Sequence, residues 1–474
     1  MLGDLLILIG ILMMIPIGIA LIYQEAQAVV FLATGGLALL TGTIFCFLFK
    51  KSKGEPLKTK DGFVLVTLSW IALSVLGAIP FLIAGTFNNP ADALFESVSG
   101  FTTTGSSVLV NVEAQPRSIL FWRSFTHWIG GIGIIVLALA ILPYLSLGGM
   151  QLFKAEFSGP VAERLRPRIT STAKRFLGIY IGLSIIIALA LQLAGMPWFD
   201  SICHMFGAIG TGGFSIKNQS IAAYHNPLIE IIIALAMFIS GTNFVLHYNF
   251  INGDFKSYFK NSEFKQYFIF ITGAILVVGA CILGNNYFSI GESFRKAMFQ
   301  VISLGTATGY STADFDTWPS LAKGILFLLM FAGGCAGSTA GGMKQIRILI
   351  LLKKIKQAVQ KNIYPSLIKP IKLAEGVLPD DIVDGIISFS IIYIITFVIL
   401  TLIMLSFNLD LITASSSVIA TMSNVGPGFN LVGPARNFAS LPSLAKYVLC
   451  FSMLIGRLEV LTVLILFFPL TWKK

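Results

Sequence analysis

Charge is scarce in this sequence. Only 12% of its 474 residues are Asp, Glu, Lys or Arg, whereas roughly 25% is typical of a soluble domain. Hydrophobic residues make up 55% of the chain and form repeated long runs. An ordinary water-soluble fold is therefore excluded, and the composition indicates a membrane protein that crosses the bilayer several times.

Residues that bind metals or catalyse reactions are also few. The chain has four histidines and five cysteines, without a CxxC pair or ligand-like spacing. The sequence contains neither a nucleophile–base set nor a phosphate-binding or dinucleotide fingerprint, so we expect no enzyme activity and no organic cofactor. The net charge of +11 does not imply nucleic acid, because basic residues collect in the cytoplasmic loops of membrane proteins.

The hydrophobic runs follow a repeated order. Two apolar spans, 5–22 and 29–49, precede four units, each made of a span, a short helix that cannot cross, a Gly-rich loop and a second span. Such self-similarity is a signal at the level of the fold. The sequence predicts an all-α polytopic membrane protein, with four span–pore-helix–span repeats around a central pore plus two N-terminal spans. The predicted regions are 1–60, 61–150, 151–251, 252–372 and 373–474.

The four loops have related compositions. Non-helical backbone at membrane depth is tolerated only where it is buried or lines a water-filled cavity. Its carbonyls can replace the hydration shell of a small cation, and glycine lets them turn toward the axis. The predicted filter residues, which would bind the transported ion, are Thr103, Thr104, Gly105, Thr211, Gly212, Gly213, Ala307, Thr308, Gly309, Asn424, Val425 and Gly426. Asp92, Asp200 and Asp410 precede or open short helices, where a carboxylate caps the helix or favours its dipole.

Polar or Gly-rich segments interrupt the second spans. We expect breaks at Gly130–Gly133, Ser240–Asn243, Gly333–Gly342 and in the sequence Gly456-Arg457-Leu458-Glu459. An arginine inside a span is costly and is by default a functional hypothesis. Arg457 is interpreted either structurally, paired with Glu459 or with backbone carbonyls, or as a barrier below the filter. The predicted gate consists of Gly337, Ser338, Thr339, Ala340, Gly341 and Arg457, with 344–372 as a lever.

The distribution of basic residues predicts the topology. Most of the 33 Lys and Arg residues fall in loops on one side, provided that the short helices re-enter from the other side. The positive-inside rule then places both termini in the cytoplasm, with ten full spans and four re-entrant segments.

These joint features resemble the Trk/Ktr/HKT superfamily of cation transporters. The shared features are the four loops, the break at 333–342, the mid-span Gly-Arg-Leu-Glu and the two extra N-terminal spans, which favour the TrkH branch. The resemblance implies a potassium pore in the bacterial inner membrane, a homodimer, and control by a cytoplasmic TrkA-like nucleotide-binding ring. In that superfamily a serine at the first filter glycine accompanies sodium transport, so Gly105 favours K⁺. Val425 and Pro427 depart from the Thr-Gly pattern and predict an asymmetric filter.

Two alternatives remain open at this point. One is a sodium or mixed-cation pore of the same architecture. The other is a secondary transporter for a small solute, which should show an inverted repeat and a midplane pocket. The residues do not decide between passive flow and proton symport.

Overall fold

The computed structural model describes residues 2–50, 59–141, 168–287, 289–366, 370–373, 376–467 and 469. Helices dominate these residues, and their strands are the two-residue pair β1 (Lys372–Leu373) and β2 (Gly376–Val377). Within the described residues, six helices are long and apolar enough to cross a membrane, or up to eight if two bent helix pairs each count as one span. The predicted all-α polytopic fold is confirmed. The predicted basic loop residues Lys51, Lys53, Lys58, Lys154, Arg164, Arg166, Lys473 and Lys474 lie outside the described residues.

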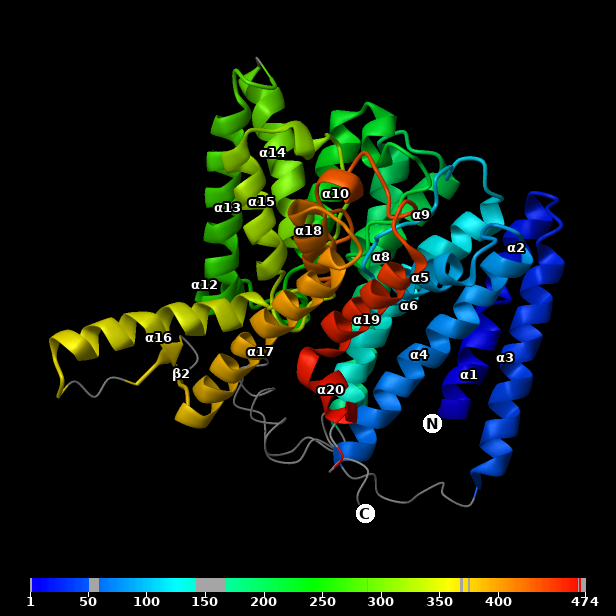
Figure 1. Cartoon of the computed structure of the whole chain (residues 1–474), viewed down its shortest axis with the longest axis horizontal. Helices are drawn as coiled ribbons and strands as arrows, with labels where there is room; N and C mark the ends of the chain where they lie inside the picture. Colours follow the sequence, from blue (N-terminus) through cyan, green and yellow to red (C-terminus); the bar gives the residue numbers. More distant parts are fainter. Residues whose placement is uncertain are drawn as a thin grey trace.

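The two N-terminal spans form a closely packed pair at one side of the molecule (Figure 1). They are α1 (Leu2–Leu12) with α2 (Ile15–Ile22), followed by α3 (Ala28–Leu48). Glycines permit the contact between α1 and α3: a Cβ on Gly42 would lie 2.8 Å from the backbone nitrogen of Ile7.

Four units of span, short helix and second span follow. The first has α4 (Thr59–Ile83), α5 (Pro90–Phe101) and α6 (Arg117–Ile141). The second has α8 (Arg168–Leu193), α9 (Trp198–Ile209), α10 (Pro227–Ser240) and α11 (Phe244–Ile251), and ends in α12 (Lys256–Lys260). The third has α13 (Ser262–Ile282), α14 (Ile290–Gly305) and α15 (Ser320–Ala332), followed by α16 (Gln345–Ile363). The fourth has α17 (Asp380–Leu405), α18 (Leu411–Met422), α19 (Ser443–Leu458) and α20 (Val460–Leu464). Short 3₁₀ turns are η2 (Ser220–Tyr224), η3 (Phe315–Thr317), η4 (Asn430–Val432) and η5 (Ile465–Phe467).

Local capping explains where the short helices begin. Asn89 caps α5 by accepting a hydrogen bond from the Ala91 backbone N–H, with Pro90 at the first helical position. Asp410 caps α18 in the same way through the Thr413 N–H. Asp92 and Asp200 instead lie in the first turns of α5 and α9, where a carboxylate favours the helix dipole.

The second spans differ in continuity. Those of the second and fourth units bend by 100° and 118°, and that of the third stops at Ala332, as predicted. The predicted break at Gly130–Gly133 is wrong, because α6 is one continuous helix. These glycines instead allow close packing, since a Cβ on Gly130 would lie 2.0 Å from the Phe101 carbonyl oxygen at the end of α5.

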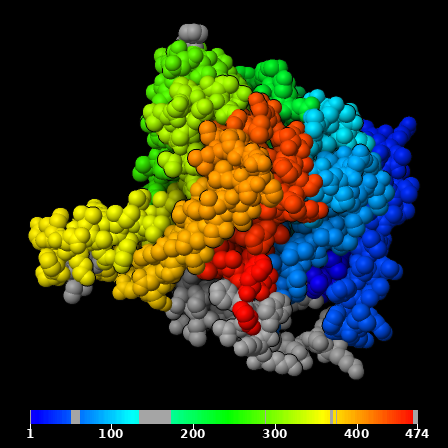
Figure 2. All heavy atoms as spheres, in the orientation of Figure 1, coloured from blue at the N-terminus to red at the C-terminus, as the bar shows by residue number. Residues whose placement is uncertain are grey.

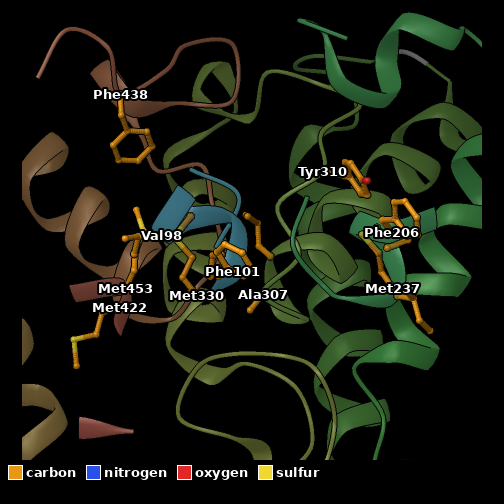
Figure 3. Close-up of a cluster of buried hydrophobic side chains, with 14 of the residues drawn as sticks. Val98, Phe101, Phe206, Met237, Ala307, Tyr310, Met330, Met422, Phe438 and Met453 are labelled. Atoms are coloured by element: carbon orange, nitrogen blue, oxygen red, sulfur yellow. The ribbon is translucent and has the colours of Figure 1, made fainter. Parts of the chain in front are cut away.

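The four short helices lie in the centre of the hydrophobic core. Figure 3 shows side chains from them, among them Val98 and Phe101 of α5 and Met422 of α18, close to residues of the surrounding spans. Phe101 packs edge-on against Trp122 of α6. The helix ends, and the loops that follow them, are therefore held in a densely packed frame.

The long helix α16 extends away from this body, as the space-filling view in Figure 2 shows. It contacts the start of α17 and carries Lys353, Lys354, Lys356 and Lys361. Figure 1 places α16 at the same end of the molecule as α20 and the start of α1.

Candidate ion pathway

Each short helix ends in the same backbone turn. The first residue of each predicted filter triplet has a left-handed backbone conformation. These residues are Thr103, Thr211, Ala307 and Asn424, with φ of 53°, 50°, 53° and 55°. In the first loop, the Thr104 N–H donates to Ser99 O (2.8 Å) and the Thr103 N–H to Gly100 O (3.1 Å). This is a Schellman motif, and matching bonds occur in the other three loops. The sequence repeat is therefore a repeat of backbone geometry.

The four loops close into a ring in chain order. Each filter glycine has positive φ. It lies against a carbonyl of the next loop, that of the residue immediately before that loop's own filter glycine. We call each such contact a joint and describe it by the distance from a Cβ built on the glycine to the carbonyl oxygen. The joints are Gly105 to Gly212 (2.0 Å), Gly213 to Thr308 (2.0 Å), Gly309 to Val425 (2.0 Å) and Gly426 to Thr104 (2.9 Å). The structure thus brings all four predicted filter segments together, and the fourth joint is looser than the others.

Side chains within the ring follow a two-fold pattern. The Thr102 and Thr104 hydroxyls pair at 2.7 Å in the first loop, and Thr306 and Thr308 pair at the same distance in the third. The second loop has Gly212 at the matching position and the fourth has Val425. From the sequence, only the fourth loop was expected to differ from the others. In the structure the second loop also lacks the threonine pair that loops one and three contain.

The predicted gate segment crosses directly beneath the ring. Thr339 donates through its hydroxyl to Ile209 O (3.0 Å) at the end of α9 and to Ser240 O (3.2 Å). A Cβ on Gly341 would lie 2.1 Å from Ser423 O at the end of α18. The segment between α15 and α16 therefore reaches from the third unit to the second and fourth units, at the C-terminal ends of their short helices.

Side chains hold this segment at its base. Glu263, which is buried at the start of α13, accepts hydrogen bonds from the backbone N–H groups of Ala336 (2.7 Å) and Ile346 (3.0 Å). Lys344 donates to the carbonyl of Ala340. Glu263 could not be singled out from the sequence, because an acidic residue in the first turn of a helix is ordinary.

Arg457 contacts the predicted gate directly. Its Nη1 donates to the Thr339 carbonyl (2.8 Å) and its Nη2 to the Gly130 carbonyl (2.9 Å), and the residue is buried. It thereby links the first, third and fourth units below the filter. The alternative pairing with Glu459 is wrong, since Glu459 accepts from Arg347 Nη2 (2.7 Å) at the start of α16. Pairing with backbone carbonyls, the other structural interpretation, is confirmed.

A family model described as TrkH, a cation transport protein, matches residues 27–276 and 274–473 of this chain. The chain belongs to the TrkH family. The Trk system potassium uptake protein TrkH of Salmonella typhimurium is 41% identical over 477 residues, covering 100% of this chain and 98% of that protein. The protein of the same name from Halomonas elongata is 37% identical, and TrkG of Escherichia coli is 34% identical, both over 100% of this chain and 98% of their own length.

A solved structure gives the same result for the fold. The crystal structure of the potassium transporter TrkH from Vibrio parahaemolyticus is 38% identical and matches with a TM-score of 0.91 over 99% of this chain and 98% of that chain. The TrkH-family fold therefore covers both N-terminal spans and all four units described above.

Proposed function

We propose that this chain forms a gated potassium pore for uptake across the bacterial inner membrane. The observation that carries the proposal is the closed ring of four Gly loops, with backbone carbonyls at every joint. The curated relatives named above are potassium uptake proteins, which supports K⁺ as the transported ion. Gly105 at the first joint favours potassium over the alternative, a sodium or mixed-cation pore. The four units run in the same order of elements, which argues against an inverted-repeat transporter of a small solute.

The decisive experiment is growth rescue of a bacterium that lacks its own potassium uptake. Expression of this chain, with and without a co-expressed TrkA-like partner, should restore growth at low K⁺. The matched control is Gly213→Ala, which crowds a filter joint and should abolish rescue at equal expression. Rescue that requires sodium, or sodium uptake without K⁺ uptake, would favour the alternative.

The segment 333–344 acts as the gate in this proposal. It lies across the inner side of the ring, and Arg457 holds its Thr339 carbonyl while placing a positive charge near the path of a cation. Opening requires the segment to withdraw, and α16, which begins at Gln345 directly after it, connects the gate to the cytoplasmic side.

This gate is tested by rubidium flux into proteoliposomes. Arg457→Ala and a deletion within 336–341 should both raise flux and weaken its dependence on the partner. Arg457→Lys keeps the charge but lacks the two-armed guanidinium, so it should fall between Arg457→Ala and the parent. Lower flux in Arg457→Ala and in the deletion, with normal thermal stability, would assign these elements to support of the pore.

The proposed assembly is a homodimer in the lipid bilayer, controlled by a cytoplasmic nucleotide-binding ring, with both termini in the cytoplasm. The projecting basic helix α16 and its position at the same end as α20 support this orientation. Fusions of a periplasmic reporter enzyme to the C-terminus should be inactive, and light scattering in detergent should give the mass of two chains.

A further inference from the structure

The second filter loop lacks a side chain that its neighbours use. Loops one and three carry Thr104 and Thr308 before the filter glycine, and each hydroxyl bonds to a second threonine of its own loop. Loop two has Gly212 there, so it cannot make this bond. A Cβ on Gly212 would lie 2.4 Å from Cγ of His127, a fully buried side chain of α6. The imidazole of the first unit therefore occupies the space of the absent side chain.

The hydrogen bonds of His127 define its tautomer. Nδ1 lies 2.8 Å from the carbonyl of Gly100, which can only accept, so Nδ1 carries the proton. Nε2 lies 3.2 Å from the backbone N–H of Phe214, which can only donate, so Nε2 is the acceptor. The neutral ring thus connects the end of α5 to the residue that directly follows the filter glycine of loop two.

Phe214 is held from several sides. Its ring centroid lies 4.2 Å from that of His127 and 3.6 Å from the Arg123 guanidinium carbon. The Tyr310 hydroxyl of the third unit lies between two carbonyl oxygens that share its proton, His204 O (3.0 Å) and Phe214 O (3.2 Å). Figure 3 shows Tyr310 on the same side of the core as Phe206 of α9. Both backbone polar groups of Phe214 are therefore bound by side chains from the adjacent units.

An ion pair with Glu96 holds the Arg123 side chain in place. Its Nε donates to Glu96 of α5 (2.5 Å) and its Nη1 to the Ser215 carbonyl (2.7 Å), and both ionised side chains are buried. Glu96 also accepts from the Val108 N–H (2.9 Å). These contacts hold the Arg123 side chain in place, because breaking a buried ion pair would leave a charge uncompensated.

We propose that His127 is a positioning residue for loop two, which replaces the missing threonine and fixes the Gly212 and Gly213 carbonyls through Phe214. This inference rests on the proposed function, since it concerns selectivity among monovalent cations. A carbonyl ring selects by the number and placement of its oxygens. In loops one and three a pair of threonines within the loop supports this placement, whereas loop two takes the matching support from the first unit.

Two substitutions separate the two bonds of His127. His127→Asn places an amide nitrogen near Nδ1, so it keeps the bond to Gly100 O and loses the acceptor for Phe214 N–H. His127→Gln places an amide oxygen near Nε2, so it keeps that acceptor and loses the bond to Gly100. The preference for Rb⁺ over Na⁺, measured by competition flux in proteoliposomes, should fall about tenfold in His127→Asn, the equivalent of about 1.4 kcal/mol. His127→Gln should stay within about threefold of the parent.

The matched control is His247→Asn. His247 is also buried and also has two hydrogen-bond partners, Tyr258 and Ile239 O, but it lies in α11 away from the ring. This variant measures what losing one buried imidazole does to folding, and its selectivity should equal that of the parent. Equal selectivity of His127→Asn and His127→Gln, or a larger loss in His127→Gln, would overturn the proposal.

Phe214→Leu is a second test that leaves His127 in place and is used if the histidine variants fold poorly. Leucine keeps the backbone N–H that donates to His127 but removes the ring contacts with His127 and Arg123 that hold residue 214 in place, so selectivity should fall while Rb⁺ flux persists. Parental selectivity in Phe214→Leu would likewise overturn the proposal. The proposed function is tested separately by the parent chain, because absence of Rb⁺ and K⁺ flux in the parent would refute the pore itself.

Discussion

Alanine at the four filter glycines should have unequal effects. All four glycines have φ between 78° and 105°, so each alanine carries a comparable backbone cost of about 1–2 kcal/mol. Crowding differs: the new Cβ would lie 2.0 Å from a carbonyl oxygen at Gly105, Gly213 and Gly309, but 2.9 Å at Gly426. Carbon–oxygen contacts normally begin near 3.3 Å, so the carbonyl must move by about 1.3 Å at the first three joints and by about 0.4 Å at the fourth.

The assay is K⁺ and Na⁺ competition against Rb⁺ uptake in proteoliposomes. Alanine at each of the first three glycines should reduce K⁺ selectivity by about tenfold or more, and Gly426→Ala by about threefold or less, because selectivity depends on carbonyl placement. Gly178→Ala, where a Cβ would meet no atom within 4 Å, controls for the substitution itself. If Gly426→Ala is as damaging as Gly213→Ala, crowding at the joints does not determine selectivity.

Three further outcomes follow from the contacts. Glu263→Leu leaves two backbone N–H groups without their acceptor, that of Ala336 in the gate segment and that of Ile346 in the first turn of α16. The free energy of unfolding should therefore fall by about 1–3 kcal/mol per orphaned group, measured as a lower thermal unfolding temperature, and leak flux should rise, whereas Glu263→Gln should stay close to the parent in both. Gly212→Ala should lower Rb⁺ flux because its Cβ meets the ring of His127, and adding His127→Ala should recover part of the flux without the selectivity. Charge reversal at Lys353, Lys354 and Lys356 of α16 should reduce both pull-down of the proposed nucleotide-binding partner and regulated flux. If neither changes, membrane topology is a sufficient explanation of these three lysines.

The order of helices could be predicted because hydropathy and capping are local signals. Asp410 and the Asn89–Pro90 pair mark helix starts in the sequence as they do in the structure. Glycine inside a span is ambiguous, since it serves both helix breaks and close helix contacts. Gly130 makes a close helix contact, because its neighbour is the carbonyl oxygen of Phe101 in another helix. Gly333 lies in a helix break, because its neighbour is the carbonyl oxygen of Gly341 in the same break. Only the structure shows these neighbours.

The part of the candidate site that could be predicted is the part that depends on depth in the membrane, because the number of residues after each filter glycine indicates that depth. Arg457 and the Gly-rich break fall at similar distances after their filter glycines, and the structure joins them through Thr339. The partner of Glu459 was not predictable, because Arg347 is distant in sequence and belongs to another unit. His127 could not be predicted for the same reason. A lone histidine in an apolar span has no spacing signature, and its partner Phe214 follows the second loop, far along the chain.

Because the ring closes in chain order, its last joint has a consequence for biosynthesis. Gly426 meets Thr104, so the first and fourth quarters touch only after the C-terminal quarter has entered the membrane. Domains of a growing chain form from the N-terminus onward, and the earlier joints can assemble during synthesis. A chain arrested before α18 would lack the joints Gly309 to Val425 and Gly426 to Thr104, and its three loops would form an open horseshoe in place of a ring.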